Sequence, residues 1–336
     1  MSVPRPTCID VHTHVVPEHF PPYAGRAAGA AWPSTVPAHA CHRHVMLSGK
    51  VYRTVSDRCW DPALRAADMD GQGVARQVLS PMPELLSYWL DGADGGALAR
   101  YLNEQIAAMV AQAPDRFFGL GAVPLQDLDR AVAELEHAIG TLGLAGVEIG
   151  TNVNGVVLGD ARLEPFFAAA ERLGAAIFVH PLRPAGMERL VGPPNLEQIV
   201  AFPGETGLAA ASLLTGGTLA RHPGLRIALS HGGGSLAMLL PRLQHGWQTF
   251  AALREAVPEA PQAGARRLWV DSLVYDRLAL EHLIERFGPT QVCVGSDFPF
   301  AIAEPDPVGR VAALSVDAAL REQLLHRNAE RWLGVS

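Results

Sequence analysis

The sequence predicts an eight-stranded β/α barrel (a TIM barrel) with a small insertion after its first strand. Three observations predict this class: short apolar segments alternate with longer amphipathic ones, the apolar segments number eight, and polar residues gather at their C-terminal ends. Near-continuous apolar runs are typical of parallel strands that are covered on both faces. Eight such strands alternating with helices favour a barrel over the alternative, an open doubly wound sheet.

The expected strands extend over most of the chain. They are residues 8–14, 75–82, 117–125, 145–151, 176–182, 226–232, 268–272 and 292–298. The connecting segments have helical patterns and helix end signals. Residues 127–142 begin at Asp127, an N-cap residue, and residues 163–173 stop before Gly174, which is typical of a helix C-terminus. Residues 279–287 precede a Gly-Pro pair that ends a third helix.

One segment does not follow the alternation of strands and helices. Residues 17–60 are rich in Pro, Gly, Ala and His, and they are too many for an ordinary loop. We therefore expect a single barrel domain over residues 1–336, with residues 17–60 as a small insertion over the barrel mouth. Short strands are expected near residues 44–53.

Composition excludes several classes of partner. The 27 basic and 34 acidic residues give a net charge of −7, which argues against binding nucleic acid or an anionic membrane surface. No apolar run reaches the ~20 residues of a membrane helix, and the N-terminal MSVPRPTCIDVHTH lacks the apolar core of a signal peptide. The 4 cysteines contain no CxxC pair and fit a reducing cytoplasm. We expect a cytoplasmic protein that acts on a small molecule.

The strongest local signal is a pair of histidines at the end of the first strand. His12 and His14 are two residues apart, so both side chains point to the same face of a strand. His180 and Asp297, at the ends of the fifth and eighth strands, would complete a mixed nitrogen and oxygen site for one metal. This donor set suits zinc and is also compatible with manganese, iron or cobalt. The alternative is polar capping of a strand end, which the two additional ligands disfavour.

Other polar residues at strand ends have more than one interpretation. His231, within LSHGGGS, is a fifth ligand, a core residue or, as we favour, an acid/base, because imidazole titrates near neutral pH. Glu148 either faces the barrel mouth or pairs with an arginine as a buried carboxylate. Asp10 either orients a ligand histidine or is structural. Arg53 and Arg242 can each hold a substrate carboxylate, the alternative being a solvated surface charge.

The motifs of this chain resemble those of metal-dependent decarboxylases related to the amidohydrolases. The resemblance covers nearly the whole chain and rests on motifs that occur in a fixed order. These are DVHTH at 10–14, WDP at 60–62, VPLQD at 123–127, GVEIGTNVNG at 146–155, HP at 180–181, HGGGS at 231–235 and GSDFPF at 295–300. The resemblance implies a β/α barrel that catalyses the non-oxidative decarboxylation of an unsaturated or aromatic carboxylic acid.

The resemblance also implies roles for single residues. Zinc would be bound by the four candidate ligands without any organic cofactor, and Asp297 would be both ligand and catalytic residue. His231 would be the base and proton carrier. Arg53 would bind the substrate carboxylate, and Arg242 would reach into the site of a neighbouring subunit, which implies a homodimer. The residues at 190–200 (LVGPPNLEQIV) replace a tryptophan-rich stretch of the resembled enzymes, so the substrate wall differs.

The sequence is also compatible with two alternative functions. One is hydrolysis of a lactone, amide or ester with water activated by the same metal, because both chemistries use nearly the same ligands. The other is a barrel without activity that serves as a binding or regulatory subunit. The complete ligand set disfavours the second alternative.

Overall fold

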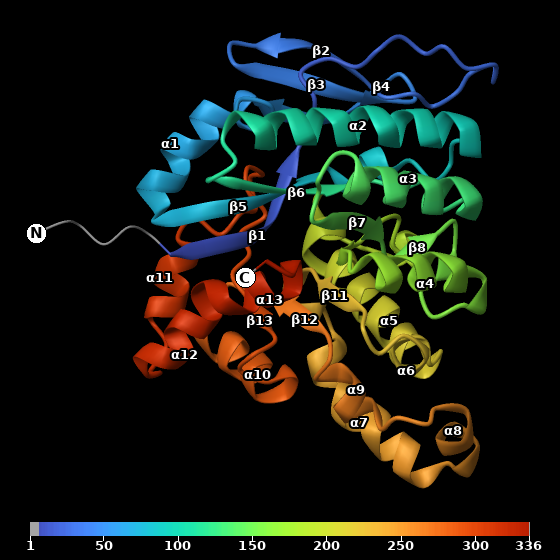
Figure 1. The fold of residues 1–336 in the computed structure, drawn as a ribbon, viewed down its shortest axis with the longest axis vertical. Coiled ribbons are helices and arrows are strands. Elements are labelled where there is room, and N and C mark those ends of the chain that lie inside the picture. The colour runs from blue at the N-terminus through green and yellow to red at the C-terminus, as the bar shows by residue number, and fades with distance from the viewer. Residues whose placement is uncertain (1–6, 336) are drawn as a thin grey trace, which may run out of the picture.

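The computed structural model describes residues 7–335, and a ring of parallel strands forms its centre (Figure 1). Within these residues eight strands pair in the order β1-β5-β6-β7-β10-β11-β12-β13. Their bounds are β1 Cys8–Val15, β5 Val74–Pro81, β6 Phe117–Gly121, β7 Gly146–Gly150, β10 Ala176–His180, β11 Arg226–Leu229, β12 Trp269–Asp271 and β13 Val292–Cys293. The predicted barrel is confirmed.

The ring closes between its first and last strands. Isolated parallel bridges join Asp10 to Val294 and Thr13 to Phe298, and the amide of His14 donates to the carbonyl of Phe298 at 2.7 Å. All eight predicted strands are present, but the last is much shorter than expected. Its extension past Cys293 pairs with β1 at these isolated positions rather than along a continuous ladder.

Helices surround the ring, and α13 lies near its centre in the view of Figure 1. Their bounds are α1 Pro62–Gln72, α2 Gly92–Gln112, α3 Leu128–Gly140, α4 Glu164–Leu173, α5 Phe202–Thr215, α6 Thr218–Arg221, α7 Leu236–Thr249, α8 Ala251–Ala256, α9 Pro261–Ala265, α10 Arg277–Phe287, α11 Pro307–Ala312, α12 Ala318–Glu322 and α13 Asn328–Leu333. The predicted end signals are confirmed. The Asp127 side chain accepts a hydrogen bond from the Arg130 amide at 3.2 Å, and Gly174 ends α4 with a φ of 60°.

Two smaller sheets lie outside the ring. β2 (Ser34–His39), β3 (His42–Leu47) and β4 (Lys50–Ser56) form an antiparallel sheet, and β8 (Asn152–Val153) pairs with β9 (Val156–Val157). The strands expected near residues 44–53 are therefore present. The role of residues 17–60 as a cover of the mouth stays a prediction. In Figure 1, α7, α8 and α9 project from the barrel as an arm.

Apolar side chains fill the barrel beneath its polar end. Trp332 of α13 is fully buried, and its ring centroid lies 6.0 Å from that of Phe178 on β10. The Phe178 ring in turn lies 5.0 Å from the imidazole of His12. Burial of such large aromatic surfaces stabilises the fold. It also places rigid apolar packing directly beneath the polar residues of β1.

The helices and the cysteines bear on the expected location of the protein. Within residues 7–335 no helix is both long enough and apolar enough to cross a bilayer. Cys8, Cys41, Cys59 and Cys293 are all free thiols. The expected absence of a signal peptide concerns a segment that includes residues 1–6, which lie outside the described residues.

Candidate metal centre and its cavity

Four side chains predicted as ligands come together at the C-terminal end of the barrel. One ligand atom from each of His12, His14, His180 and Asp297 lies within 4.8 Å of the others, and all four residues are buried. The Nε2 atoms of His12 and His14 are 3.1 Å apart. Asp297 Oδ1 lies 3.1 Å from the Nε2 of His14 and 3.5 Å from that of His12. Residues far apart in the sequence thus share one small volume.

The second nitrogen of each ligand histidine already has an acceptor. His12 Nδ1 lies 2.7 Å from Asp271 Oδ2, and the Nδ1 atoms of His14 and His180 each lie 3.1 Å from a proline carbonyl. An Nδ1 that donates leaves Nε2 with a bare lone pair, and lone pairs that face each other repel unless a cation lies between them. Histidine ligands of metals show this arrangement. The donor set of three nitrogens and one carboxylate therefore fits one divalent metal.

Asp271, at the end of β12, links the candidate ligand His12 to the turn at His231, a role that was not predicted from the sequence. Its carboxylate accepts hydrogen bonds from His12 Nδ1, from the His231 amide at 2.9 Å and from the Gly232 amide at 2.7 Å. Its place at a strand end was the available signal. Asp10 instead binds the amides of His12 and Ser296, so its contacts are structural and do not orient an imidazole.

The surroundings favour the ionisation state that a metal needs at three of the four residues and oppose it at His12. Burial lowers the pKa of His14 and, more strongly, that of His180, so both stay neutral. Burial also acts to lower the pKa of His12, but the hydrogen bond to Asp271 and the nearby carboxylates outweigh it and raise this pKa to about 9. Burial acts to raise the pKa of Asp297, yet the hydrogen bond with His14 and the charge interactions with the neighbouring histidines together outweigh burial and lower it.

Glu148 of β7 is fully buried beside the centre. Its Oε2 lies 3.8 Å from His14 Nδ1, and neither carboxylate oxygen has a hydrogen-bond partner within the described residues. Burial raises its pKa well above the usual range. Among residues 7–335 no arginine forms an ion pair with Glu148, so the interpretation as an arginine-paired carboxylate was wrong.

His231 occupies a tight turn, residues His231–Gly233, that follows β11. Its own φ is 54°, and those of the next three glycines are 65°, 75° and 60°. A Cβ at Gly234 would lie 2.1 Å from the Pro203 carbonyl oxygen, so only glycine fits there. The ring centroid of His231 lies 5.1 Å from that of His180, and burial lowers the His231 pKa to about 4. A neutral imidazole therefore stands beside the four candidate ligands.

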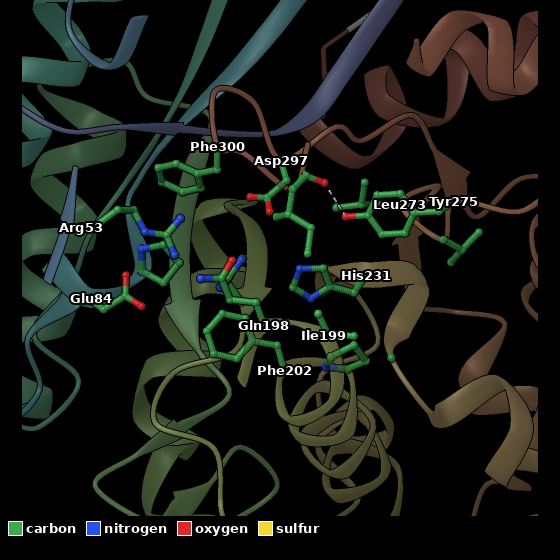
Figure 2. A pocket seen from close by; sticks show the side chains of 16 residues that line it. Arg53, Glu84, Gln198, Ile199, Phe202, His231, Leu273, Tyr275, Asp297 and Phe300 are labelled. Carbon is green, nitrogen blue, oxygen red and sulfur yellow. Dashed lines mark hydrogen bonds between the residues drawn. The ribbon is translucent and has the colours of Figure 1, made fainter. Parts of the chain in front are cut away.

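A cavity of about 310 Å³ opens onto this centre. Figure 2 shows Asp297 and His231 in its middle, Arg53 and Glu84 at one end, and Tyr275 on the opposite side. The remaining walls are mainly apolar, as in many small-molecule sites. Glu84 and Tyr275 are residues that the sequence analysis missed. Both residues follow the ends of predicted strands, but no motif around either residue indicates a place in the cavity.

The two candidate substrate arginines are placed differently. The guanidinium carbon of Arg53 lies 4.2 Å from the ring centroid of Phe300, and both residues line the cavity. Within residues 7–335 no carboxylate forms an ion pair with Arg53. Arg242 is exposed on α7 and is absent from the described lining of this cavity. Of the two arginines, a single chain therefore places only Arg53 in the cavity beside the candidate metal ligands.

A family model described as amidohydrolase matches residues 9–335. The chain belongs to the amidohydrolase family. This amidohydrolase is 37% identical over 331 residues to 2-amino-3-carboxymuconate-6-semialdehyde decarboxylase of Dictyostelium discoideum, over 97% of this chain and 91% of that protein. It is 29% identical to the enzyme of the same name from Caenorhabditis elegans, over 97% of this chain and 94% of that one.

Solved structures agree with this assignment. The 5-carboxyvanillate decarboxylase of Sphingomonas paucimobilis superposes with a TM-score of 0.76 at 28% identity, covering 83% of this chain and 85% of that one. The enzyme of the same name from Novosphingobium aromaticivorans, complexed with manganese and 4-hydroxy-3-methoxy-5-nitrobenzoic acid, gives 0.74 at 25% identity, covering 83% and 82%. This amidohydrolase is accordingly a carboxy-lyase.

Proposed function

We propose that this chain is a zinc-dependent non-oxidative decarboxylase of an unsaturated or aromatic carboxylic acid similar to 2-amino-3-carboxymuconate 6-semialdehyde. The observation that carries the proposal is one cavity lined by His180, Asp297, His231 and Arg53, the last of which has no ion-pair partner within residues 7–335. An acid held by Arg53 would lie beside both the metal ligands and a neutral imidazole. The three-nitrogen, one-carboxylate set supports zinc, and the manganese of the Novosphingobium relative makes the choice of metal part of the test.

Arg53 binds the substrate in this proposal. A planar guanidinium can hold a carboxylate through two parallel hydrogen bonds. The Phe300 ring supports the guanidinium from one face, so less conformational freedom is lost on binding. The apolar walls near Phe202 and Leu273 keep water out and strengthen these charge interactions.

His231 carries the proton. Decarboxylation breaks a carbon–carbon bond, releases carbon dioxide and leaves an electron pair on the substrate carbon, which must then take up one proton. The Nδ1 of His231 lies 3.2 Å from the Ser230 hydroxyl, and its Nε2 has no hydrogen-bond partner among residues 7–335. Nε2 takes up a proton from solvent, or from a substrate hydroxyl that regains one from solvent, and delivers it to that carbon, so that one proton is consumed for each carbon dioxide released. A bound divalent metal supplies the Lewis acid that stabilises the developing negative charge.

Mass spectrometry of the products tests this function. Zinc-loaded and manganese-loaded protein is incubated with 2-amino-3-carboxymuconate 6-semialdehyde, ortho-hydroxybenzoates and several lactones. Loss of one carbon dioxide from an acid, abolished by a chelator, is the expected result. Gain of one water by a lactone, with no acid losing carbon dioxide, would establish the alternative hydrolase instead.

We also propose a cytoplasmic homodimer in which Arg242 serves the site of the neighbouring subunit. The arm that carries Arg242 projects from the barrel (Figure 1). Met238 and Leu239 on the same helix are 74% and 46% exposed, and Phe250 at its end is 64% exposed. Such an apolar surface supports contact with a second protein copy. The free thiols support a reducing compartment.

A further inference from the structure

The cavity contains a carboxylate for which the proposed reaction has no use. Glu84 lies in a short helical turn, Pro83–Leu86, just after β5, and it lines the same cavity as Arg53. The hydroxyl of Tyr52, on β4, donates a hydrogen bond to Glu84 Oε1. Oε2 has no hydrogen-bond partner within the described residues and so keeps its full capacity to accept.

Arg53 and Glu84 lie side by side at one end of the cavity but do not pair with each other. Figure 2 shows both groups there, and within residues 7–335 no ion pair joins them. The Arg53 guanidinium carbon lies 5.8 Å from the Tyr52 ring centroid, so one strand positions both the cation and the donor to Glu84. Among the described residues, this end of the cavity therefore presents a guanidinium without an ion-pair partner beside a carboxylate that has one open acceptor oxygen.

This pair of charges restricts what can bind. A carboxylate held by Arg53 lies close to the carboxylate of Glu84, and like charges in a poorly solvated site repel strongly. An N–H or O–H group between the two carboxylates converts that repulsion into a hydrogen bond to a charged acceptor, one of the stronger kinds. An acid without such a donor meets only the repulsion.

We propose that Glu84 is a specificity-determining residue that accepts a hydrogen bond from an amino or hydroxyl group next to the carboxylate held by Arg53. Tyr52 is its positioning residue. The substrate class is thereby narrowed to unsaturated or aromatic acids that carry such a donor beside the carboxylate. This inference rests on the proposed function, because it takes Arg53 as the carboxylate-binding residue.

Isothermal titration calorimetry of the zinc-loaded protein tests the inference with three probes of similar size. These are 2-aminobenzoate, 2-hydroxybenzoate and 2-fluorobenzoate, the last of which has no donor beside its carboxylate. We expect at least one donor-bearing probe to bind about tenfold more tightly than 2-fluorobenzoate. Whichever of 2-aminobenzoate and 2-hydroxybenzoate binds more tightly identifies the donor as an amino or a hydroxyl group.

Variants separate the specificity role from other effects. Glu84→Leu should abolish the preference, and Tyr52→Phe should reduce it while leaving affinity for 2-fluorobenzoate unchanged. Glu197→Gln is the matched control, because Glu197 is a neighbouring carboxylate that is absent from the cavity lining. It should keep the preference. Glu84→Gln, which preserves size, replaces Glu84→Leu if the latter does not fold, and should weaken the preference.

Two results would overturn the inference: equal affinity of all three probes for the wild-type protein, or an undiminished preference in folded Glu84 variants. Failure of the proposed function has a different signature. Arg53→Gln should weaken the three probes by a common factor, and no change in that variant would reject Arg53 as the carboxylate-binding residue. Release of carbon dioxide by the wild-type protein is measured separately, and its absence would reject the proposed function whichever way the three probes bind.

Discussion

The carboxylate of Asp271 connects His12 to the turn that carries His231. It accepts hydrogen bonds from His12 Nδ1 and from the His231 and Gly232 amides. We expect Asp271→Asn to lower metal affinity by about 10–100-fold, because partners that orient ligand histidines have effects of this size. Competition with a chromophoric chelator measures it. Glu148→Gln is the control, since its carboxylate makes no hydrogen bond to any described residue, and equal affinity of Asp271→Asn and the control would contradict this role.

A second prediction separates proton transfer from metal binding. His231 lies beside the candidate ligands but outside the group of four. We expect His231→Gln to lower kcat by roughly 10²–10⁴-fold, the usual contribution of a general acid or base, with metal content unchanged. Turnover and elemental analysis of the same sample measure both quantities. Parallel loss of the metal would instead make His231 a fifth ligand.

The pKa of His12 gives metal binding a pH dependence. This pKa is raised to about 9, so below that pH a proton must leave His12 before Nε2 can bind a metal. The apparent affinity of the metal-stripped protein should therefore rise with pH, by about tenfold per unit from His12 alone, and level off near pH 9. Titrations with zinc buffers between about pH 6 and about pH 8 measure the slope. A flat profile would show that His12 is already neutral.

At the scale of elements, the site depends on the close approach of β1, β12 and the segment after β13. A Cβ at Gly295 would lie 2.7 Å from the Asp271 Cβ and 2.9 Å from the His12 Cβ. We expect Gly295→Ala to lower the free energy of unfolding by about 1–3 kcal/mol through overpacking and to weaken metal binding. Urea unfolding measures the first effect.

The control for this change is Gly140→Ala. Gly140 is the last residue of α3, and a Cβ there meets no atom within 4 Å. Alanine is favoured over glycine in helices by up to about 1 kcal/mol, so this variant should unfold at an equal or higher urea concentration. Equal stability of both variants would mean that the strands can separate without cost.

The elements differ in how far the sequence could predict them. Apolar runs and helix end signals such as Asp127 and Gly174 are local, and they sufficed for the strand set and the closed barrel. The contact between His12 and Asp271 joins residues 259 positions apart. No local pattern encodes such a contact, because it depends on how the ring closes. The pairing of Tyr52 with Glu84 was missed for the same reason.

At the scale of the whole molecule, the projecting arm predicts the assembly state. Sedimentation velocity of the wild-type protein should give a dimer, and Met238→Asp should shift it toward monomer, because a charge replaces a side chain that is 74% exposed and apolar. Arg242→Gln should leave the dimer intact and lower kcat/KM. A monomeric wild-type protein with full activity would reject the proposed role of Arg242.

The seam of the ring, where β1 meets the segment after β13, determines when the metal site can form during protein synthesis. β1 and the segment after β13 meet through isolated bridges, and the candidate ligands lie on both sides of that seam. A chain leaving the ribosome exposes His12 and His14 almost at once, but it lacks the carboxylate until Asp297 has been added. The four-ligand set therefore cannot form during most of translation. The ion is acquired by a nearly finished protein, and its identity reflects the metals that the cell then offers.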